Sequence, residues 1–196
     1  MMSEKDISQG CKRGIANAQQ ELFDQYSQHL MAVIYRYVAN DDDASDVLHG
    51  TFITIFTTIK SFKWEGKGSL KAWTTRIAVN NAINFLRKRK RLINNSAPLE
   101  NVADPPDDDD EQLTSSIGGI DLDTILQMIA ELPDGYRTVF NLHRLDGYSH
   151  QEIAQQLGIS VKTSTSQLAR AKAILANRIR EHVNKLNNIW PHYEQQ

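Results

Sequence analysis

The stretch GYSHQEIAQQLGISVKTSTSQLARAK, residues 147–172, decides the fold of the carboxy-terminal part of the chain. Ser149 and Glu152 have the spacing of a capping box, in which each side chain satisfies an unpaired backbone N–H at the start of a helix. Gly158 follows where the chain must turn sharply, a conformation that favours glycine, and Ser160 can cap a second helix. The stretch therefore predicts a helix over residues 150–157, a tight turn, and a longer helix from residue 161 to about 186.

The turn between these two helices has the pattern of a helix-turn-helix motif. Ile153, Leu157 and Ile159 supply apolar contacts, and Ala154 is small enough to let the two helices cross closely. A small residue followed four positions later by glycine, with apolar flanks, is typical of this motif. An ordinary helical hairpin with a solvated basic face is the alternative interpretation of the same residues.

The last helix has two different faces when about 100° is taken per residue. Its inward face is predicted to hold Val161, Ser164, Leu168, Ala171 and Leu175. The opposite face combines hydrogen-bonding and cationic groups, namely Lys162, Thr163, Ser166 and Arg170. Such groups can contact base edges and phosphates in a DNA major groove, so the pattern predicts a helix that reads duplex DNA.

The charge is unevenly distributed, although 22 Lys plus Arg against 24 Asp plus Glu give the chain a formal charge of -2. Residues 1–95 hold 14 basic and 9 acidic residues, whereas residues 96–119 hold 7 acidic and no basic ones. Residues 120–196 balance at 8 and 8, but residues 160–186 contain one glutamate and the cations Lys162, Arg170, Lys172, Arg178, Arg180 and Lys185. A nearly neutral total therefore hides two basic surfaces, which favours a nucleic-acid partner.

The acidic segment combines Pro-Pro, a run of five acidic residues and Gly-Gly with few apolar anchors. This composition is typical of a flexible linker that charge repulsion keeps extended. We therefore expect a domain over residues 1–95, a flexible acidic linker over 96–119, a second domain over 120–187 and a tail over 188–196. The acidic run at residues 107–111 has an alternative interpretation, as a decoy that competes with DNA for the basic surfaces.

Both domains are predicted to be helical bundles, which makes the fold all-α. In the first domain apolar residues recur at steps of three and four, as a buried helix stripe requires, at Leu22, Tyr26, Leu30, Val33 and Tyr37. A second helix is expected from residue 42 or 43 to about 61, and a third over residues 70–91, with a glycine-containing loop over 62–69 between them. Pro133 and Gly147 punctuate the second domain and predict helices over residues 121–131 and 134–145.

Several function classes are excluded by what the sequence lacks. The amino-terminal residues do not form the apolar stretch of a signal peptide, and no apolar run could span a bilayer, so we expect a cytoplasmic chain without membrane insertion. The lone cysteine, Cys11, is interpreted as an incidental thiol near a mobile end. The six histidines have no metal-binding spacing and no nucleophile motif is present, so we expect no enzyme, cofactor or metal site.

Three segments resemble parts of one family. Residues 132–160, LPDGYRTVFNLHRLDGYSHQEIAQQLGIS, closely resemble the promoter-reading region of bacterial sigma factors, particularly the extracytoplasmic-function (ECF) branch of the sigma-70 family. Residues 44–56 resemble the helix by which these factors dock on RNA polymerase, and residues 68–91 resemble the helix that opens the minus-10 element. The resemblance covers most of residues 20–180 and implies a sigma factor with a region 2-like and a region 4-like helical domain.

The resemblance also implies roles for individual residues. The clamp helices of the polymerase's largest subunit would meet Asp46, Val47, Leu48, His49, Phe52 and Phe56. The minus-10 element would be bound and melted by Phe62, Trp64, Lys71, Arg76, Asn80, Asn84, Arg87 and Lys88. The minus-35 element would be read by Ser160, Lys162, Thr163, Thr165, Ser166, Gln167 and Arg170. The implied partners are core RNA polymerase, including its flap region, promoter DNA, and an anti-sigma factor as a further candidate.

The residues of the first domain suit such a role on physical grounds as well. A protein that opens DNA needs pockets for unstacked bases and cations for phosphates. The loop with Trp64, next to a basic helix, offers both, whereas Trp73 recurs with Ile77 and is interpreted as core. The basic run at residues 87–91 has an alternative interpretation, as a solvated helix end that the helix dipole favours.

Three positions depart from the usual pattern of the family. His49 stands where many relatives carry Gln, while Thr165 and Gln167 stand where Lys and Arg are common. The loss of these cations should weaken the nonspecific grip on phosphates without changing the fold. Restoring both, with Thr165→Lys and Gln167→Arg, is expected to steepen the salt dependence of DNA binding by up to about 1.8 log units per log unit of salt, at about 0.9 per phosphate.

A stand-alone helix-turn-helix regulator, with a helical sensing or dimerisation domain, is the alternative function. Such a regulator should bind duplex DNA tightly by itself, usually at palindromic sites. A sigma factor should instead co-purify with core polymerase and direct initiation in a purified assay.

Overall fold

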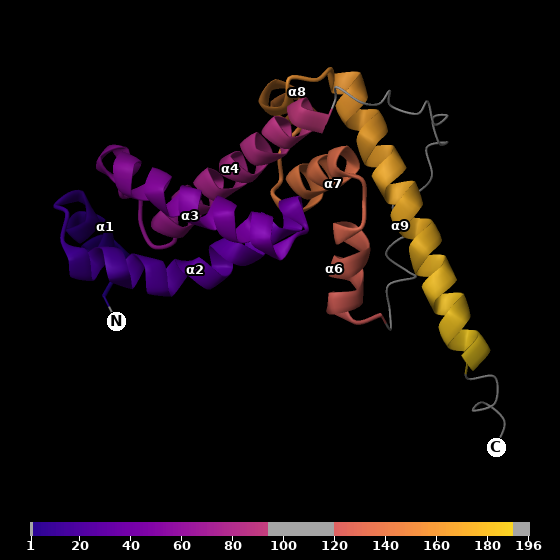
Figure 1. Ribbon diagram of the computed structural model, residues 1–196, viewed down its shortest axis with the longest axis horizontal. Coiled ribbons are helices and arrows are strands. Elements are labelled where there is room, and N and C mark those ends of the chain that lie inside the picture. The colour runs from indigo at the N-terminus through magenta and orange to yellow at the C-terminus, as the bar shows by residue number, and fades with distance from the viewer. Residues whose placement is uncertain (1, 94–119, 190–196) are drawn as a thin grey trace. The chain divides into compact units, whose positions relative to one another are not determined.

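The computed structural model describes residues 2–93 and 120–189, and every regular element in these two ranges is a helix (Figure 1). The chain divides into two compact units, residues 1–98 and 99–196. The predicted all-α fold with two helical domains is thereby confirmed. The predicted linker, its acidic run and residues 190–196 lie outside the described residues. No helix in the described ranges combines the length and the hydropathy of a membrane span.

Unit 1 contains four α-helices and one short 3-10 helix: α1 (Glu4–Lys12), α2 (Ala16–Val38), α3 (Asp41–Thr58), η1 (Ile59–Ser61) and α4 (Ser69–Ile93) (Figure 1). Helices α2, α3 and α4 pack against one another, and α1 lies on α2. The start of α3 agrees with the predicted helix to within two residues. Asn40 caps it by accepting a hydrogen bond from the Asp43 N–H at 2.9 Å, and three aspartates in its first turn suit the positive end of the helix dipole.

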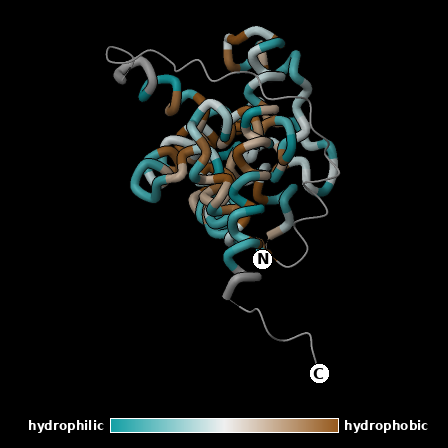
Figure 2. The backbone as a smooth tube through the Cα atoms, turned by 90° about the vertical axis from the view of Figure 1, so that its right-hand side faces the viewer, coloured by the Kyte–Doolittle hydropathy of each residue, from teal (hydrophilic) through white to brown (hydrophobic). Residues whose placement is uncertain are grey.

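The core of unit 1 lies between these helices. The predicted stripe on α2 is buried at all five of its positions, Leu22, Tyr26, Leu30, Val33 and Tyr37, which confirms that interpretation. Figure 2 shows hydrophobic and hydrophilic stretches alternating along the helices, as amphipathic helices require. Trp73 is only half-buried, and its ring lies 5.3 Å from that of Phe62.

Helix α1 is absent from the helices that the sequence predicts. Ser3 caps it by accepting a hydrogen bond from the Asp6 N–H, and Ile7 is fully buried. The helix crosses α2 so closely that a Cβ at Gly10 would overlap the Ala18 side chain. The interpretation of Cys11 as a thiol near a mobile end is therefore wrong. It is buried in α1, and burial raises the pKa of its thiol to about 11, which keeps it protonated and unreactive.

Unit 2 contains α6 (Leu122–Ala130), α7 (Asp134–Phe140), the π-helical segment η2 (Asn141–Leu145), α8 (His150–Leu157) and α9 (Val161–Ile189). Helices α7 and α8 both pack on α9. The single helix predicted over residues 134–145 thus changes its winding at Asn141, whose carbonyl accepts from the Asp146 N–H at 3.0 Å. Gly147, with φ +75°, then turns the chain into α8.

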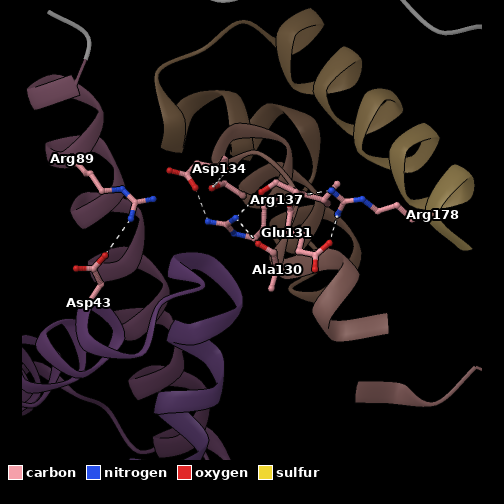
Figure 3. Close-up of polar contacts among 9 residues, drawn as sticks. Asp43, Arg89, Ala130, Glu131, Asp134, Arg137 and Arg178 are labelled. Carbon is pink, nitrogen blue, oxygen red and sulfur yellow. Dashed lines mark hydrogen bonds and ion pairs between the residues drawn. The ribbon is translucent and has the colours of Figure 1, made fainter. Parts of the chain in front are cut away.

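Two arginines fix the carboxyl end of α6, where helix carbonyls lack partners of their own. The buried guanidinium of Arg137 donates to the carbonyls of Ala130 (2.8 Å) and Leu132 (2.6 Å) and contacts the Asp134 carboxylate at 2.6 Å (Figure 3). From α9, Arg178 donates to the Met128 carbonyl at 2.8 Å and lies 3.4 Å from the Glu131 carboxylate. Both cations therefore serve the packing of α6 against its neighbours.

Candidate nucleic-acid interface

The helix-turn-helix predicted over residues 147–172 is present. The Ser149 hydroxyl accepts from the Glu152 N–H, and the Glu152 carboxylate accepts from the Ser149 N–H at 2.9 Å, contacts that lower the pKa of Glu152. Gly158 ends α8 in the left-handed region at φ +67°. Ser160 then caps α9 by accepting from the Thr163 N–H at 2.9 Å. All three sequence signals for this motif are confirmed.

The inward face of α9 begins later than the sequence predicts. Ser164, Leu168, Ala171 and Leu175 are buried as expected. Val161 is 46% exposed, and its assignment to the inward face is wrong. It is the first residue of the helix, and the buried face starts one turn further on, at Ser164.

A buried polar contact joins α9 to α8. The hydroxyl of Ser164, which is fully buried, lies 2.9 Å from His150 Nδ1. The His150 ring in turn stacks on the His143 ring of η2, with 4.5 Å between their centroids. Burial, and to a lesser degree the charge of Lys172, lowers the pKa of His150. The helix-turn-helix is therefore held by the His150–Ser164 contact and the stacked imidazole rings as well as by its apolar side chains.

The outward face of α9 presents few cations near its start. Ser160, Lys162 and Thr165 are exposed, while Thr163, Ser166 and Arg170 are half-buried. Hydroxyl groups on this face are bonded within their own helix: Thr165 Oγ1 donates to the Val161 carbonyl at 3.1 Å, and Ser166 Oγ to that of Thr163 at 3.2 Å. This face can offer hydrogen bonds to base edges and one exposed lysine to a phosphate.

Gln167, which is half-buried like Thr163, Ser166 and Arg170, also lies against a neighbouring helix. Its amide faces Gly135 of α7, where a Cβ on the glycine would stand 3.5 Å from Gln167 Nε2. The sequence predicts Gln167 as a flank of the outward face, like Thr165. In the structure the two residues lie in different surroundings, because only the Gln167 side of the helix is covered by α7.

In unit 1, the loop over residues 62–69 is anchored at its first residue. Phe62 is only 4% exposed and packs on Trp73, and its part in binding and melting the minus-10 element stays a prediction. Trp64 is half-exposed, and Lys63 and Lys67 beside it are exposed. Gly66 and Gly68, with φ of +115° and +88°, shape the turn behind them. The aromatic and cationic groups available to a ligand are therefore at the loop tip.

The predicted residues of α4 divide between two sides of the helix. Arg76, Asn80, Asn84, Arg87 and Lys88 are all exposed, and their spacing places them along one outer strip at about 100° per residue. Lys71 is also exposed, but the same count places it about 140° away from Arg76. Its charge acts on His29 of α2, whose pKa is lowered by burial and then by Lys71 and Arg36.

The predicted polymerase-docking residues of α3 are also divided. Val47, Leu48 and Phe52 are buried, and the Phe52 ring packs at a tilt on that of Phe23 of α2, with 4.7 Å between their centroids. They fill the core of unit 1, and their contact with polymerase stays a prediction. Asp46 and His49 are exposed, and Phe56 is half-buried. The exposed face continues through Ile53, which is 66% exposed.

Three residues of these surfaces are missing from the sequence-based predictions. Ile53 follows Asp46 and His49 at seven and four positions, so helix periodicity alone could have found it. Lys63 and Lys67 flank the loop tip, but nothing in the sequence indicates that Phe62 turns inward while they stay exposed. In the ranges that the structure describes, no group of three or more His, Cys, Asp or Glu side chains is arranged to hold a metal ion.

Comparison with known proteins identifies the family. The family model described as sigma-70 region 2 matches residues 22–92, and the model described as sigma-70, region 4 matches residues 122–175. The ECF RNA polymerase sigma factor SigW of Bacillus subtilis is 31% identical over 191 residues, which cover 92% of this chain and 98% of SigW. The ECF RNA polymerase sigma-E factor of Haemophilus influenzae is 28% identical over 188 residues, with 91% and 96% covered.

Solved structures of similar chains include the sigma factor RpoE from Bartonella quintana in complex with the anti-sigma factor NepR. It has a TM-score of 0.49 at 23% identity and covers 82% of this chain and 96% of that one. Because the two family models match the two helical units in order, and SigW matches across nearly the whole chain, the alternative of a stand-alone regulator is not favoured. The chain belongs to the ECF branch of the sigma-70 family, whose members bind core RNA polymerase and direct it to promoters.

Proposed function

We propose that unit 1 joins polymerase to melted minus-10 DNA through two separate faces, and that unit 2 reads the minus-35 duplex. The observation that carries this proposal is that unit 1 exposes an apolar residue on α3 and a polar, cationic strip on α4. An exposed apolar residue suits a protein partner, and a polar, cationic strip suits a nucleic-acid backbone.

The docking face on α3 consists of Asp46, His49, Ile53 and Phe56. A side chain as exposed as Ile53 can be buried by a partner without any change in the core of unit 1. Val47, Leu48 and Phe52 act behind this face, because they hold α3 against its neighbours. We assign the clamp helices of the largest polymerase subunit to the exposed set alone.

The minus-10 surface consists of the loop tip and the outer strip of α4. An unstacked base would stack on Trp64, while Lys63 and Lys67 neutralise phosphates beside it. Arg76, Asn80, Asn84, Arg87 and Lys88 continue along the strand with cations and amides. Lys71 lies away from this strip, so we leave it out of the strand contact.

In unit 2 the start of α9 reads the minus-35 element. Lys162 and Thr165 are placed for phosphates and base edges, and Ser160, Thr163 and Ser166 offer hydroxyls for further hydrogen bonds. We place the chain in the cytoplasm, where its polymerase and promoters are. Membership of the family makes an anti-sigma factor a further candidate partner. We expect no catalytic activity, because the proposed role is that of a DNA-binding initiation factor.

The decisive experiment uses purified core polymerase and a promoter found by mapping transcript starts after overexpression of the chain. Ile53→Glu should abolish co-purification with core polymerase, since interface hot spots cost about 2–4 kcal/mol. Its unfolding midpoint should not change, because the side chain is exposed. Undiminished polymerase binding by this variant would remove α3 from the docking face.

Trp64→Ala tests the loop tip separately. It should bind core polymerase normally but form fewer open complexes on duplex promoters, because base stacking contributes about 1–3 kcal/mol. A template with a pre-melted minus-10 element should restore transcription in part, since the cost of unpairing is already met. Wild-type opening by Trp64→Ala on duplex DNA would refute the assignment of base capture to Trp64.

A further inference from the structure

Helix α1 holds the base-capturing loop at both ends. At the first end, Lys12 Nζ donates to the Phe62 carbonyl at 2.5 Å and lies 5.7 Å from the centroid of the Phe62 ring. At the other end, the Gly68 N–H donates to the Glu4 carboxylate at 2.6 Å. The two contacts connect residues 50 and 64 positions apart in sequence. One short helix thus contacts both the first residue of the loop and a residue near its end.

Helix α1 is itself firmly seated on α2. The second oxygen of the Glu4 carboxylate accepts from the Tyr26 hydroxyl at 2.7 Å, and burial, followed by the contact with Glu4, raises the pKa of Tyr26. The Met2 N–H donates to Glu21 of α2 at 3.1 Å. Gly10 and Ala18 let the two helix backbones approach closely. The position of Glu4 and Lys12 is therefore fixed by the core of unit 1.

The loop needs this support because its own sequence does not stiffen it. Gly66 and Gly68 both have positive φ, and glycine gives the chain more conformational freedom than any other residue. Within the loop, Ser69 Oγ donates to the Gly66 carbonyl at 2.6 Å, which closes only the last turn. The Lys12 and Glu4 contacts lie on either side of Trp64, so they set where the loop tip can stand.

We propose that Glu4 and Lys12, termed here the α1 brace, are positioning residues for capture of the flipped minus-10 base. The proposal rests on the assignment of base capture to the loop tip. The brace acts before DNA arrives: it lowers the entropy that the loop would otherwise lose when Trp64 stacks on a base. Both residues precede residues 22–92, which the region 2 family model matches, so the family comparison does not assign them this role.

The first test measures the loop in the full-length chain by hydrogen exchange. Glu4→Ala combined with Lys12→Met should speed exchange of the Gly68 amide by about 10-fold or more, as expected for loss of a hydrogen bond to a charged group. Lys5→Met is the matched control, because Lys5 lies on the same helix and is exposed. It should leave exchange unchanged. Equal protection in the brace variant and the wild type would overturn the proposal.

Loss of Glu4 also leaves the Tyr26 hydroxyl without its acceptor, so two further variants separate the brace from helix stability. Tyr26→Phe removes that contact and keeps the Gly68 bond, and it should retain slow exchange at Gly68. Lys12→Arg keeps a donor for the Phe62 carbonyl and should keep the slow hydrogen exchange of the wild-type loop. Lys12→Met removes that donor and should make loop exchange faster. If Gly68 exchanged as fast in Tyr26→Phe as in the brace variant, the proposal would be overturned. The loop would then depend on how firmly α1 packs on α2 and not on the brace contacts themselves.

The second test measures base capture in the holoenzyme. 2-Aminopurine in the non-template minus-10 strand reports unstacking, and a panel of promoters carries each base in turn at the captured position. The brace variant should bind core polymerase as wild type does, open duplex promoters several-fold less well, and discriminate less between the four bases. A role in stability alone would reduce the amount of active holoenzyme without flattening the base preference.

The two hypotheses fail in different ways. If the brace variant loosens the loop but opens promoters and selects bases normally, while Trp64→Ala is defective, the brace proposal is wrong and base capture by the loop stands. If Trp64→Ala is also normal, the loop does not capture the base, and the brace proposal falls with it. Loosening together with loss of base preference supports both.

Discussion

The two candidate DNA surfaces use their basic residues differently. On α4 the cations Arg76, Arg87 and Lys88 lie on an exposed outer strip. On α9 some of the cations are held by the fold: Arg178 is bound to the end of α6 (Figure 3), and Arg170 is half-buried. Arg137 of α7, buried in the same unit, serves the same junction. The number of basic residues on a helix therefore does not by itself determine how cationic its surface is.

This difference shows what a charge count leaves out. An arginine that satisfies helix carbonyls keeps its charge, but its donors are occupied and its position is fixed away from a ligand. Unit 2 is therefore suited to reading base edges with hydroxyls once polymerase has brought it to DNA. Unit 1, with its exposed strip, is suited to gripping the backbone.

The largest expected effect comes from removing a structural cation of unit 2. Arg137→Met should destabilise unit 2 by about 3 kcal/mol, because one buried and one part-buried carbonyl lose their donor. Hydrogen exchange of α7 and α9 peptides in urea measures this for unit 2 alone. Arg180→Met, at an exposed position of α9, is the control and should change stability by less than about 0.5 kcal/mol. A loss below about 1 kcal/mol for Arg137→Met would contradict the structural role.

Neutralising the exposed strip of unit 1 should affect binding instead of folding. Replacing Arg76, Arg87 and Lys88 by Gln should reduce the salt slope for single-stranded DNA by up to about 2.1, at about 0.7 per phosphate. The slope is obtained from affinities measured over a range of salt concentrations. Arg178→Gln, in unit 2, should leave the slope unchanged, because that side chain is bound to α6. A triple variant with the wild-type slope would place the strip outside the DNA contact.

Adding cations to α9 tests whether positions 165 and 167 are equally accessible to DNA. The sequence alone predicts equal contributions from Thr165→Lys and Gln167→Arg. In the structure only Thr165 is exposed, while Gln167 lies against Gly135. Thr165→Lys should therefore steepen the salt slope for duplex DNA by about 0.9, and Gln167→Arg should add clearly less. Equal slopes for the two single variants would show that α7 does not restrict position 167.

The sequence was sufficient for the parts of the fold that depend on local signals. The capping box at Ser149, the turn at Gly158 and the cap at Ser160 each act through neighbouring residues, and all three are present. The apolar stripe on α2 depends on helix periodicity and is also confirmed. Local chemistry and helical repeat therefore predicted the two helical units and the helix-turn-helix.

The exposure of the candidate site residues is harder to predict, because it depends on contacts between distant segments. Phe62 looked available in a glycine-containing loop, but it is buried by Trp73 and by Lys12 of α1. Phe52 looked like a contact residue on α3, but Phe23 of α2 covers it. Helix α1 itself was missed, since its seating depends on Glu4, Gly10 and their partners on other elements.

The smallest expected effect is a dependence of the stability of each unit on pH. The structure lowers the pKa of His29 in unit 1 and of His150 in unit 2, in both cases mainly through burial. As pH falls below the unfolded-state value of about 6.5, each unfolded histidine takes up its proton before the folded one does. The stability of each unit should therefore decrease as pH falls through this range and be greatest above it.

Single substitutions can assign this pH dependence to one unit at a time. His150→Gln should flatten the pH dependence of hydrogen exchange in α8 and α9 and leave that of α2 unchanged, while His29→Gln should do the opposite. The effect should be small, because both rings are only partly buried. His143 stacks on His150, and the positive charge of Lys172 opposes protonation of His150 within unit 2. A titration by NMR that gave His150 a pKa at or above 6.5 would mean that its ring is not held neutral against Ser164.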